Sequence, residues 1–330
     1  MVSVLKKLNY IHWALIAFAL ICVVVIFIDD KYILDIIFMT FFWAAIAGAW
    51  NISGGYAGQF SLGHAAFVGI GAYTTALLFI NFHISPWIGM LVGGILAIGL
   101  ALLIGVLCFK VRGPFYTLIT IAFAQLVYIC SVQLREITGG SEGLSIPFEP
   151  GFANLMFRDR SIYVIIALVL VLIIYLLSAT LERSKLGYYL VAMRENEDAA
   201  LALGISTKKV KIIATSLSSF LTSVCGSLYA MYILFIEPNS VLSFTFSIQP
   251  AMISIIGGLG TALGPIIGSV LLTPLEMILR ETFTQINGLN LIIYGVLLVI
   301  VMLFWSDGIV NNVKKLKLKP LSGRTWARKG

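Results

Sequence analysis

Long apolar runs recur along the whole chain, and they restrict the possible folds more than any other feature of the sequence. Each run is long enough to cross a hydrocarbon core of about 30 Å as a helix. Hydrophobic residues make up 60% of the chain and charged residues only 11%, whereas soluble proteins carry about 25% charged residues. We therefore expect an all-α polytopic membrane protein with a single transmembrane domain, residues 1–330.

The apolar runs predict about ten transmembrane segments when the basic residues are kept on one side of the membrane. Segment 246–280 then has to start and finish on the outer side of the membrane. It is either a hairpin of two short spans or a re-entrant segment. The hairpin gives the total of ten. The other expected spans are residues 11–28, 33–50, 60–80, 86–109, 115–133, 161–181, 212–236 and 289–305.

The net charge of +7 is concentrated in a few places. Of the 22 Lys and Arg residues, 17 lie at residues 6–7, 110–112, 183–211 and 314–329. This positive-inside pattern predicts that both termini are cytoplasmic, with the basic tail, residues 306–330, as a topology anchor near membrane lipid rather than a nucleic-acid site. Acidic residues gather on the opposite side: Asp29, Asp30, Glu136, Glu142, Glu149, Asp159 and Glu237.

Two glycine-rich segments, residues 51–66 and 257–265, interrupt the apolar pattern, each near the same relative place in its half of the chain. Paired interruptions of this kind indicate two inverted repeats with a translocation pathway between them, and residues 33–133 and 212–305 are the expected halves. The alternative is that the glycines only allow helices to pack closely. The candidate pathway residues are Gly54, Tyr56, Gln59, Ser61, Gly63, His64, Gly257, Gly258 and Gly260.

His64 is an ionisable residue within an expected span, where such groups are costly and often functional. It could line a conduit or relay a proton, and a structural hydrogen bond to neighbouring backbone is an equal alternative. Asp35 and Glu276 lie near expected span ends, where we expect them to face interfacial water. Their positions argue against an ion-coupled secondary transporter, which would need ion ligands deep in the spans.

A charged loop, residues 182–211, separates two expected spans. The spacing of Leu186, Leu190 and Met193 predicts a first helix on the membrane surface. A second short helix is expected after an Asn cap, with a Gly at its end and a small alanine face that could fit a groove. The loop is either a docking device or an ordinary interfacial segment. Its candidate coupling residues are Arg194, Glu195, Asn196, Glu197, Ala200 and Gly204.

Catalytic and nucleotide-binding motifs are absent from the sequence. It contains no Gly-Lys dipeptide and therefore no P-loop, and no paired zinc-ligand or nucleophile-elbow motif. Its three His residues are isolated, and the four Cys residues have no metal-ligand spacing. We expect neither an enzyme nor a bound cofactor or metal.

Several blocks of this chain resemble the LivM-type permeases of branched-chain amino-acid ABC importers. Together they extend over residues 33–305, nearly the whole chain. Tyr188 and Tyr189 depart from the Arg-Ala that relatives often carry there. The matching blocks are GYAGQFSLGHAAF at 55–67 with GIGAY at 69–73, RGPFY at 112–116 with AFAQ at 122–125, TGGSEGL at 138–144, SKLG at 184–187, RENE at 194–197 and GGLGTALGP at 257–265.

The resemblance implies a transporter subunit in a bacterial or archaeal cell membrane. Its partners would be a homologous second permease, two ATP-binding subunits that hydrolyse the ATP, and an extracytoplasmic substrate-binding protein. ATPase closure would act on the loop around Arg194–Gly204 and drive alternating access. The expected cargo is branched-chain or related amino acids, and urea or short amides are the alternative within the same superfamily.

Overall fold

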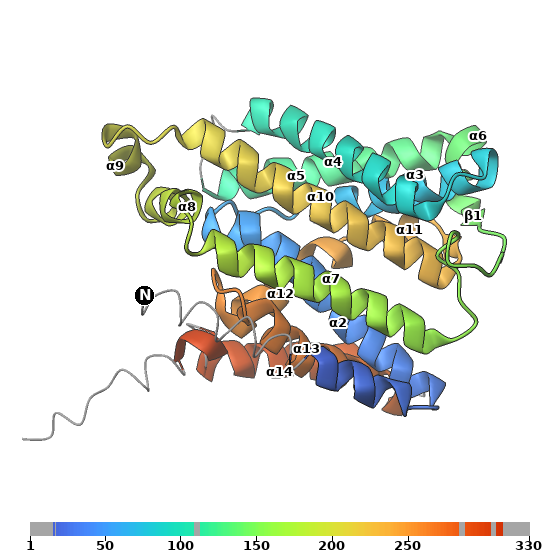
Figure 1. Ribbon diagram of the computed structural model, residues 1–330. Helices are drawn as coiled ribbons and strands as arrows, with labels where there is room; N and C mark the ends of the chain where they lie inside the picture. Colours follow the sequence, from blue (N-terminus) through green and yellow to red (C-terminus); the bar gives the residue numbers. More distant parts are fainter. Residues whose placement is uncertain (1–15, 17, 109–112, 284–287, 305–307, 313–330) are drawn as a thin grey trace, which may run out of the picture.

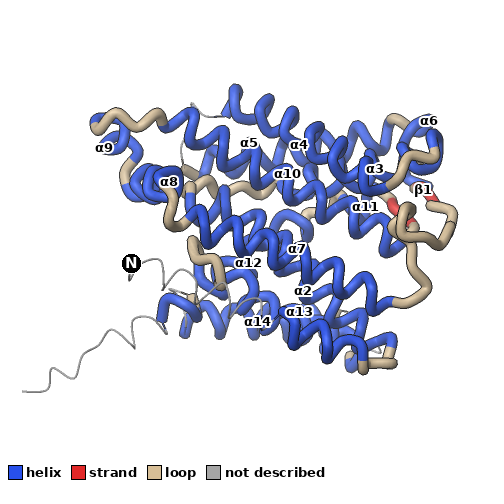
Figure 2. Tube along the Cα trace, in the orientation of Figure 1, coloured by secondary structure: helices blue, strands red, loops and turns tan. Residues whose placement is uncertain are grey.

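The computed structural model describes residues 16, 18–108, 113–283, 288–304 and 308–312, and most of these residues are helical (Figures 1 and 2). The long helices run between two ends of one bundle. One end carries the short helices α8 and α9, and the other carries α6 and the small β1 strand (Figure 1). The expected all-α architecture is confirmed for the described residues.

The first part of the chain forms a series of long helices joined by short connections. Helix α2 is extended without a break by a π-helical turn, a feature that is rare and often found at functional sites. The elements are α2 (Lys31–Asn51), the π-turn η1 (Ile52–Tyr56), α3 (His64–Phe82), α4 (Pro86–Cys108), α5 (Pro114–Gln133), α6 (Arg135–Thr138), η2 (Gly140–Glu142) and β1 (Leu144–Ser145).

The second part begins with a long helix and then the charged loop. The two-residue strands β1 and β2 pair antiparallel and join the two parts at the α6 end. The elements are α7 (Arg160–Leu181), α8 (Lys185–Glu195), α9 (Glu197–Ala202), α10 (Thr207–Ile233), β2 (Phe235–Ile236), α11 (Pro238–Val241), α12 (Thr245–Gly258), α13 (Gly264–Thr282) and α14 (Leu289–Phe304).

Helix α2 lies at the centre of the bundle, where it packs against α7, α10, α12 and α13. Its sequence explains this position, because a helix that is apolar on all sides has no face that requires water. Phe38, Phe42 and Trp50 are fully buried along it. Helix α10 packs against α3 and α4 and so connects the two sides of the bundle.

Seven helical segments in the described residues are long and apolar enough to span a membrane. They confirm a multi-pass architecture, although the span expected at 60–80 begins later, because residues 57–63 are not helical. Part of the first expected span, residues 11–15 and 17, and the tail from 313 lie outside the described residues. The seven are Lys31–Tyr56, His64–Phe82, Pro86–Gly105, Pro114–Gln133, Arg160–Leu181, Thr207–Ile233 and Pro238–Gly258.

Segment 246–280 forms two helices, α12 and α13, joined by a turn at residues 259–263. This turn lies at the α8–α9 end, because the Ala262 N–H donates to Oε1 of Glu182, directly after α7. The first glycine-rich segment lies at the same end, where Gly55 contacts Arg194. Segments related by an inverted repeat would lie at opposite ends, so the expectation that these two segments are repeat equivalents is wrong.

Candidate functional site

Helix α8 lies against the bundle through one apolar face. It begins after Ser184, whose Oγ accepts the Gly187 N–H at 3.1 Å. Leu190 and Met193 are buried and Leu186 is partly buried against the same core. The predicted spacing is therefore confirmed as the packing face of α8, and the opposite face is open to a partner.

Helix α9 has a side-chain cap at its start and a glycine just beyond its end. Oδ1 of Asn196 accepts the Ala199 N–H at 3.0 Å, and Gly204, just beyond the helix, has φ +82°. Both features confirm the predicted cap and glycine stop. Ala200, expected on an exposed small face, is only 2% exposed and packs inward, whereas Ala199 and Ala202 are exposed. The exposed surface of α9 therefore includes Ala199 and Ala202 but not Ala200.

Replacing Asn196 with alanine is expected to loosen α9, because the Ala199 N–H then loses its acceptor. Removal of such a cap costs about 1 kcal/mol of helix stability. Hydrogen exchange at residues 199–202 should accelerate about fivefold in the purified protein, consistent with that free energy. Asn196→Asp keeps the acceptor and serves as the control. Equal protection in the alanine variant would show that the cap does not hold α9.

Arg194, at the end of α8, contacts both glycine-rich segments. Its Nη1 donates to the Gly55 carbonyl at 3.0 Å, and its Nη2 pairs with Glu195 at 2.9 Å. A Cβ at Gly58 would lie 2.7 Å from Cγ of Arg194, and one at Gly260 would lie 2.7 Å from Nη1. The absence of side chains at these glycines therefore lets the arginine lie where the two segments meet.

Asn51 joins the same two segments directly. Its Nδ2 donates to the Thr261 carbonyl at 3.0 Å, and its Oδ1 accepts the Gly260 N–H at 2.9 Å. The side chain is buried, and a buried amide without partners would be costly. Asn51 therefore links the turn between α12 and α13 to the end of α2.

Glu182 was not predicted as a site residue, yet it connects three elements. Its Oε1 accepts both the Tyr56 hydroxyl at 2.9 Å and the Ala262 N–H at 2.7 Å. The only sequence signal was its place at the boundary between a span and the charged loop. Glu197, which was predicted, pairs with Lys211 at 2.6 Å and ties α9 to α10.

A cavity of about 700 Å³ opens between α8–α9, residues 57–60 and the start of α5. Gln59 lines it, although its side chain is only 6% exposed. Within the described part of the chain, its Oε1 accepts no protein hydrogen bond. Arg194, Glu195, Asn196 and Glu197 also line the cavity. Four of the six predicted coupling residues and one predicted pathway residue therefore line the same cavity, whereas Ala200 and Gly204 do not.

His64 and Ser61 form polar contacts inside the bundle. Nε2 of His64 lies 2.9 Å from Oγ of Ser218 on α10, which is 3.2 Å from Oγ of Ser53. The Ser61 carbonyl accepts Nε1–H of Trp50 at 2.7 Å. His64 thus makes a structural hydrogen bond, but its partner is a side chain of α10 and not the neighbouring backbone that was expected. In the described residues, no group of three or more His, Cys, Asp or Glu could hold a metal ion.

The remaining predicted pathway residues are closely packed. A Cβ at Gly257 would lie well under 3.0 Å from the Gly264 carbonyl, and one at Gly63 would lie 2.6 Å from the Thr120 carbonyl. Gly54 and Gly258 are buried as well. In this conformation these glycines allow close packing, as the alternative interpretation expected, and none of them lines the large cavity.

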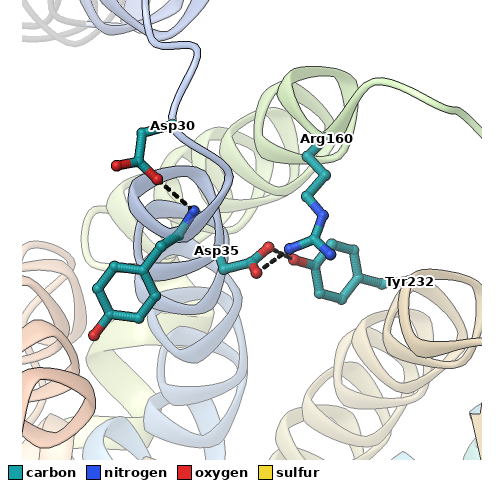
Figure 3. Close-up of polar contacts among 5 residues, drawn as sticks. Asp30, Asp35, Arg160 and Tyr232 are labelled. Atoms are coloured by element: carbon teal, nitrogen blue, oxygen red, sulfur yellow. Dashed lines mark hydrogen bonds and ion pairs between the residues drawn. The ribbon is translucent and has the colours of Figure 1, made fainter. Parts of the chain in front are cut away.

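A second polar cluster lies at the end opposite α8 and α9. Asp35 of α2 pairs with Arg160 of α7 and accepts the hydroxyl of Tyr232 of α10 (Figure 3). The Asp35 side chain is 28% exposed, so it has both solvent access and two protein partners that were not predicted. Glu276 of α13 is partly buried and accepts Nε2–H of Gln249 at 2.7 Å. Both acids have partners that are distant in the sequence.

Comparison with known proteins places this geometry in context. The LivM high-affinity branched-chain amino acid transport permeases of Escherichia coli K12 and Salmonella typhimurium LT2 are each 28% identical to this chain, over 92% of it and 76% of their own length. A probable LivM permease of Methanocaldococcus jannaschii is 23% identical over 78% of the chain and 75% of its own length. No solved structure matches the chain. Residues 32–302 match the family described as "Branched-chain amino acid transport system / permease component", and the chain therefore belongs to this family of transporter permeases.

Proposed function

We propose that this permease subunit of an ATP-binding-cassette importer carries branched-chain or related amino acids inward. The names of its relatives support the cargo. The observation that carries the mechanism is the junction at Arg194, where the α8–α9 segment contacts both glycine-rich segments. Movement imposed on α8 and α9 would pass through this junction to the ends of α2, α12 and α13.

The exposed side of α8 and α9 is the proposed contact with an ATP-binding subunit, at the cytoplasmic face of the cell membrane. The basic residues of this loop and of the tail support that orientation, as positive charge favours the cytoplasmic side. Both termini would then be cytoplasmic. A second permease, a second ATP-binding subunit and an extracytoplasmic binding protein complete the proposed assembly, and ATP is bound by the partners.

Ten spans and an inverted repeat remain our proposal for the single domain. Helices α2 and α10 support it, because α2 ends beside Arg194 whereas α10 begins beside Glu197 and ends beside Asp35. They run in opposite directions, as the first helices of inverted halves would. The half α2–α5 then corresponds to α10, α12, α13 and α14. In this pairing, residues 234–244 correspond to the first glycine-rich segment.

The predicted pathway residues would form a conduit when these halves move. Gln59 supports this role, because its buried side chain borders the cavity beside α8 and α9. The closely packed glycines would then act at the helix crossings that have to slide. Gly54, Tyr56, Ser61, Gly63, His64, Gly257, Gly258 and Gly260 keep this proposed role.

Deletion of the gene should abolish uptake of labelled leucine, isoleucine and valine, and reintroduction of the gene should restore that uptake. Purification in mild detergent should recover a P-loop ATPase and a second permease with the chain. Loss of urea uptake alone would move the cargo to urea or short amides and keep the architecture. Transport by the chain alone, without ATP, would contradict the importer assignment.

A further inference from the structure

The polar cluster at the end opposite α8 and α9 borders a second cavity, of about 400 Å³. This volume lies within the range of small-molecule sites, about 300–1,000 Å³. Asp35, Arg158, Arg160 and Tyr232 contribute its polar wall. In the proposed orientation, this end faces the outside, where a binding protein would release its cargo.

The charges in this cavity are within reach of a ligand. The side chains of Arg160 and Asp35 are 45% and 28% exposed, and both point to one place together with the Tyr232 hydroxyl (Figure 3). An ion pair this exposed contributes little net stability. A ligand that brings both a positive and a negative charge can therefore separate the pair and satisfy both members.

The other wall of the same cavity is apolar. Met39, Phe157 and Met277 line it. An aliphatic side chain that enters this space leaves water, which is favourable in proportion to the apolar area buried. The cavity thus has the opposite charges of Asp35 and Arg160, with Arg158 as a second cation, on one side and an apolar surface on the other. This arrangement matches a free α-amino acid with an aliphatic side chain.

We propose that this cavity is the receiving site for the amino-acid zwitterion. The guanidinium of Arg160 would bind the carboxylate, a pairing for which its planar donors are suited. The carboxylate of Asp35 and the hydroxyl oxygen of Tyr232 would accept hydrogen bonds from the ammonium. The proposal rests on the proposed function and adds to it a site within the permease that recognises both ends of the amino-acid backbone.

The test is binding of labelled L-leucine to the complete importer in nanodiscs, without its binding protein. We expect saturable binding that unlabelled leucine displaces. Leucinamide, which lacks the carboxylate, and 4-methylpentanoate, which lacks the ammonium, should not displace it. Absence of saturable binding, or equal displacement by either analogue, would overturn the proposal without any mutation.

Variants of the charged cavity residues test whether leucine binds in this cavity. Asp35→Asn and Arg160→Gln should each weaken leucine binding by about tenfold or more, as expected for the loss of a charged hydrogen bond. Glu149→Gln, which removes an exposed acid that does not line the cavity, is the matched control. Wild-type affinity in both site variants would place the binding elsewhere.

The charge-swapped double variant, Asp35→Arg with Arg160→Asp, separates recognition from a purely structural pair. It retains an ion pair between α2 and α7 but reverses the charges that meet the zwitterion. Binding should therefore stay weak, whereas recovery of wild-type binding would show that the pair only links the two helices. If deletion of the gene leaves leucine uptake intact, the proposed function itself fails, and that result is distinct from wild-type binding in the site variants.

Discussion

An importer that carries Arg194→Ala should hydrolyse ATP yet transport about tenfold less amino acid per ATP. The variant loses the hydrogen bond from Nη1 to the Gly55 carbonyl and the contacts with Gly58 and Gly260. A hydrogen bond from a charged group contributes about 1.5–3 kcal/mol. We take the lower end, because the side chain is 31% exposed and partly screened, and each 1.4 kcal/mol corresponds to about tenfold.

The measurement is uptake and ATP hydrolysis in the same proteoliposomes, with the amount of assembled importer determined by gel filtration. Lys31→Ala is the matched control, since it removes one exposed positive charge from the start of α2, at the opposite end of the bundle. Glu182→Ala should resemble Arg194→Ala, because it releases Tyr56 and the Ala262 N–H. Unchanged transport per ATP in the Arg194 variant would show that the junction does not transmit movement.

Features encoded by neighbouring residues could be predicted from the sequence. The cap at Asn196, the stop at Gly204 and the packing face of α8 each depend on residues within one or two helical turns. The membrane class likewise follows from long apolar runs. These patterns indicate helix boundaries and buried faces, but they carry no information about which distant segments meet.

Features that depend on distant contacts could not be predicted. Glu182 acquires its role from Tyr56 and Ala262, which lie far from it in the sequence. Asp35 was expected to face interfacial water because it lies near the end of an expected span, and nothing in the sequence indicated its ion pair with Arg160, 125 residues away. The two glycine-rich segments were taken as inverted equivalents because their composition is similar, whereas the end of the bundle at which each lies depends on the number of helices between them.

Replacing Gly257 with alanine should have the largest effect on assembly, because the α12 and α13 backbones approach most closely there. The added Cβ would lie well under 3.0 Å from the Gly264 carbonyl and 2.9 Å from the Gly268 N, and backbone atoms cannot rotate away. Small residues that allow such approach are typical of packed membrane helices. Overpacking costs about 1–3 kcal/mol in ordinary cores, and a backbone clash should reach the upper end.

We therefore expect Gly257→Ala to lower the melting temperature of the purified importer by several degrees and to reduce its amount in the membrane. Gly99→Ala in α4 is the matched control, because no atom lies within 4 Å of the added Cβ. Alanine has a higher helix propensity than glycine by about 1 kcal/mol, so this control should be neutral or slightly stabilising. Because both variants add one methyl group to a helix, a difference between them isolates the contact between α12 and α13. Equal melting temperatures and uptake in the two variants would mean that these helices do not pack backbone to backbone at Gly257.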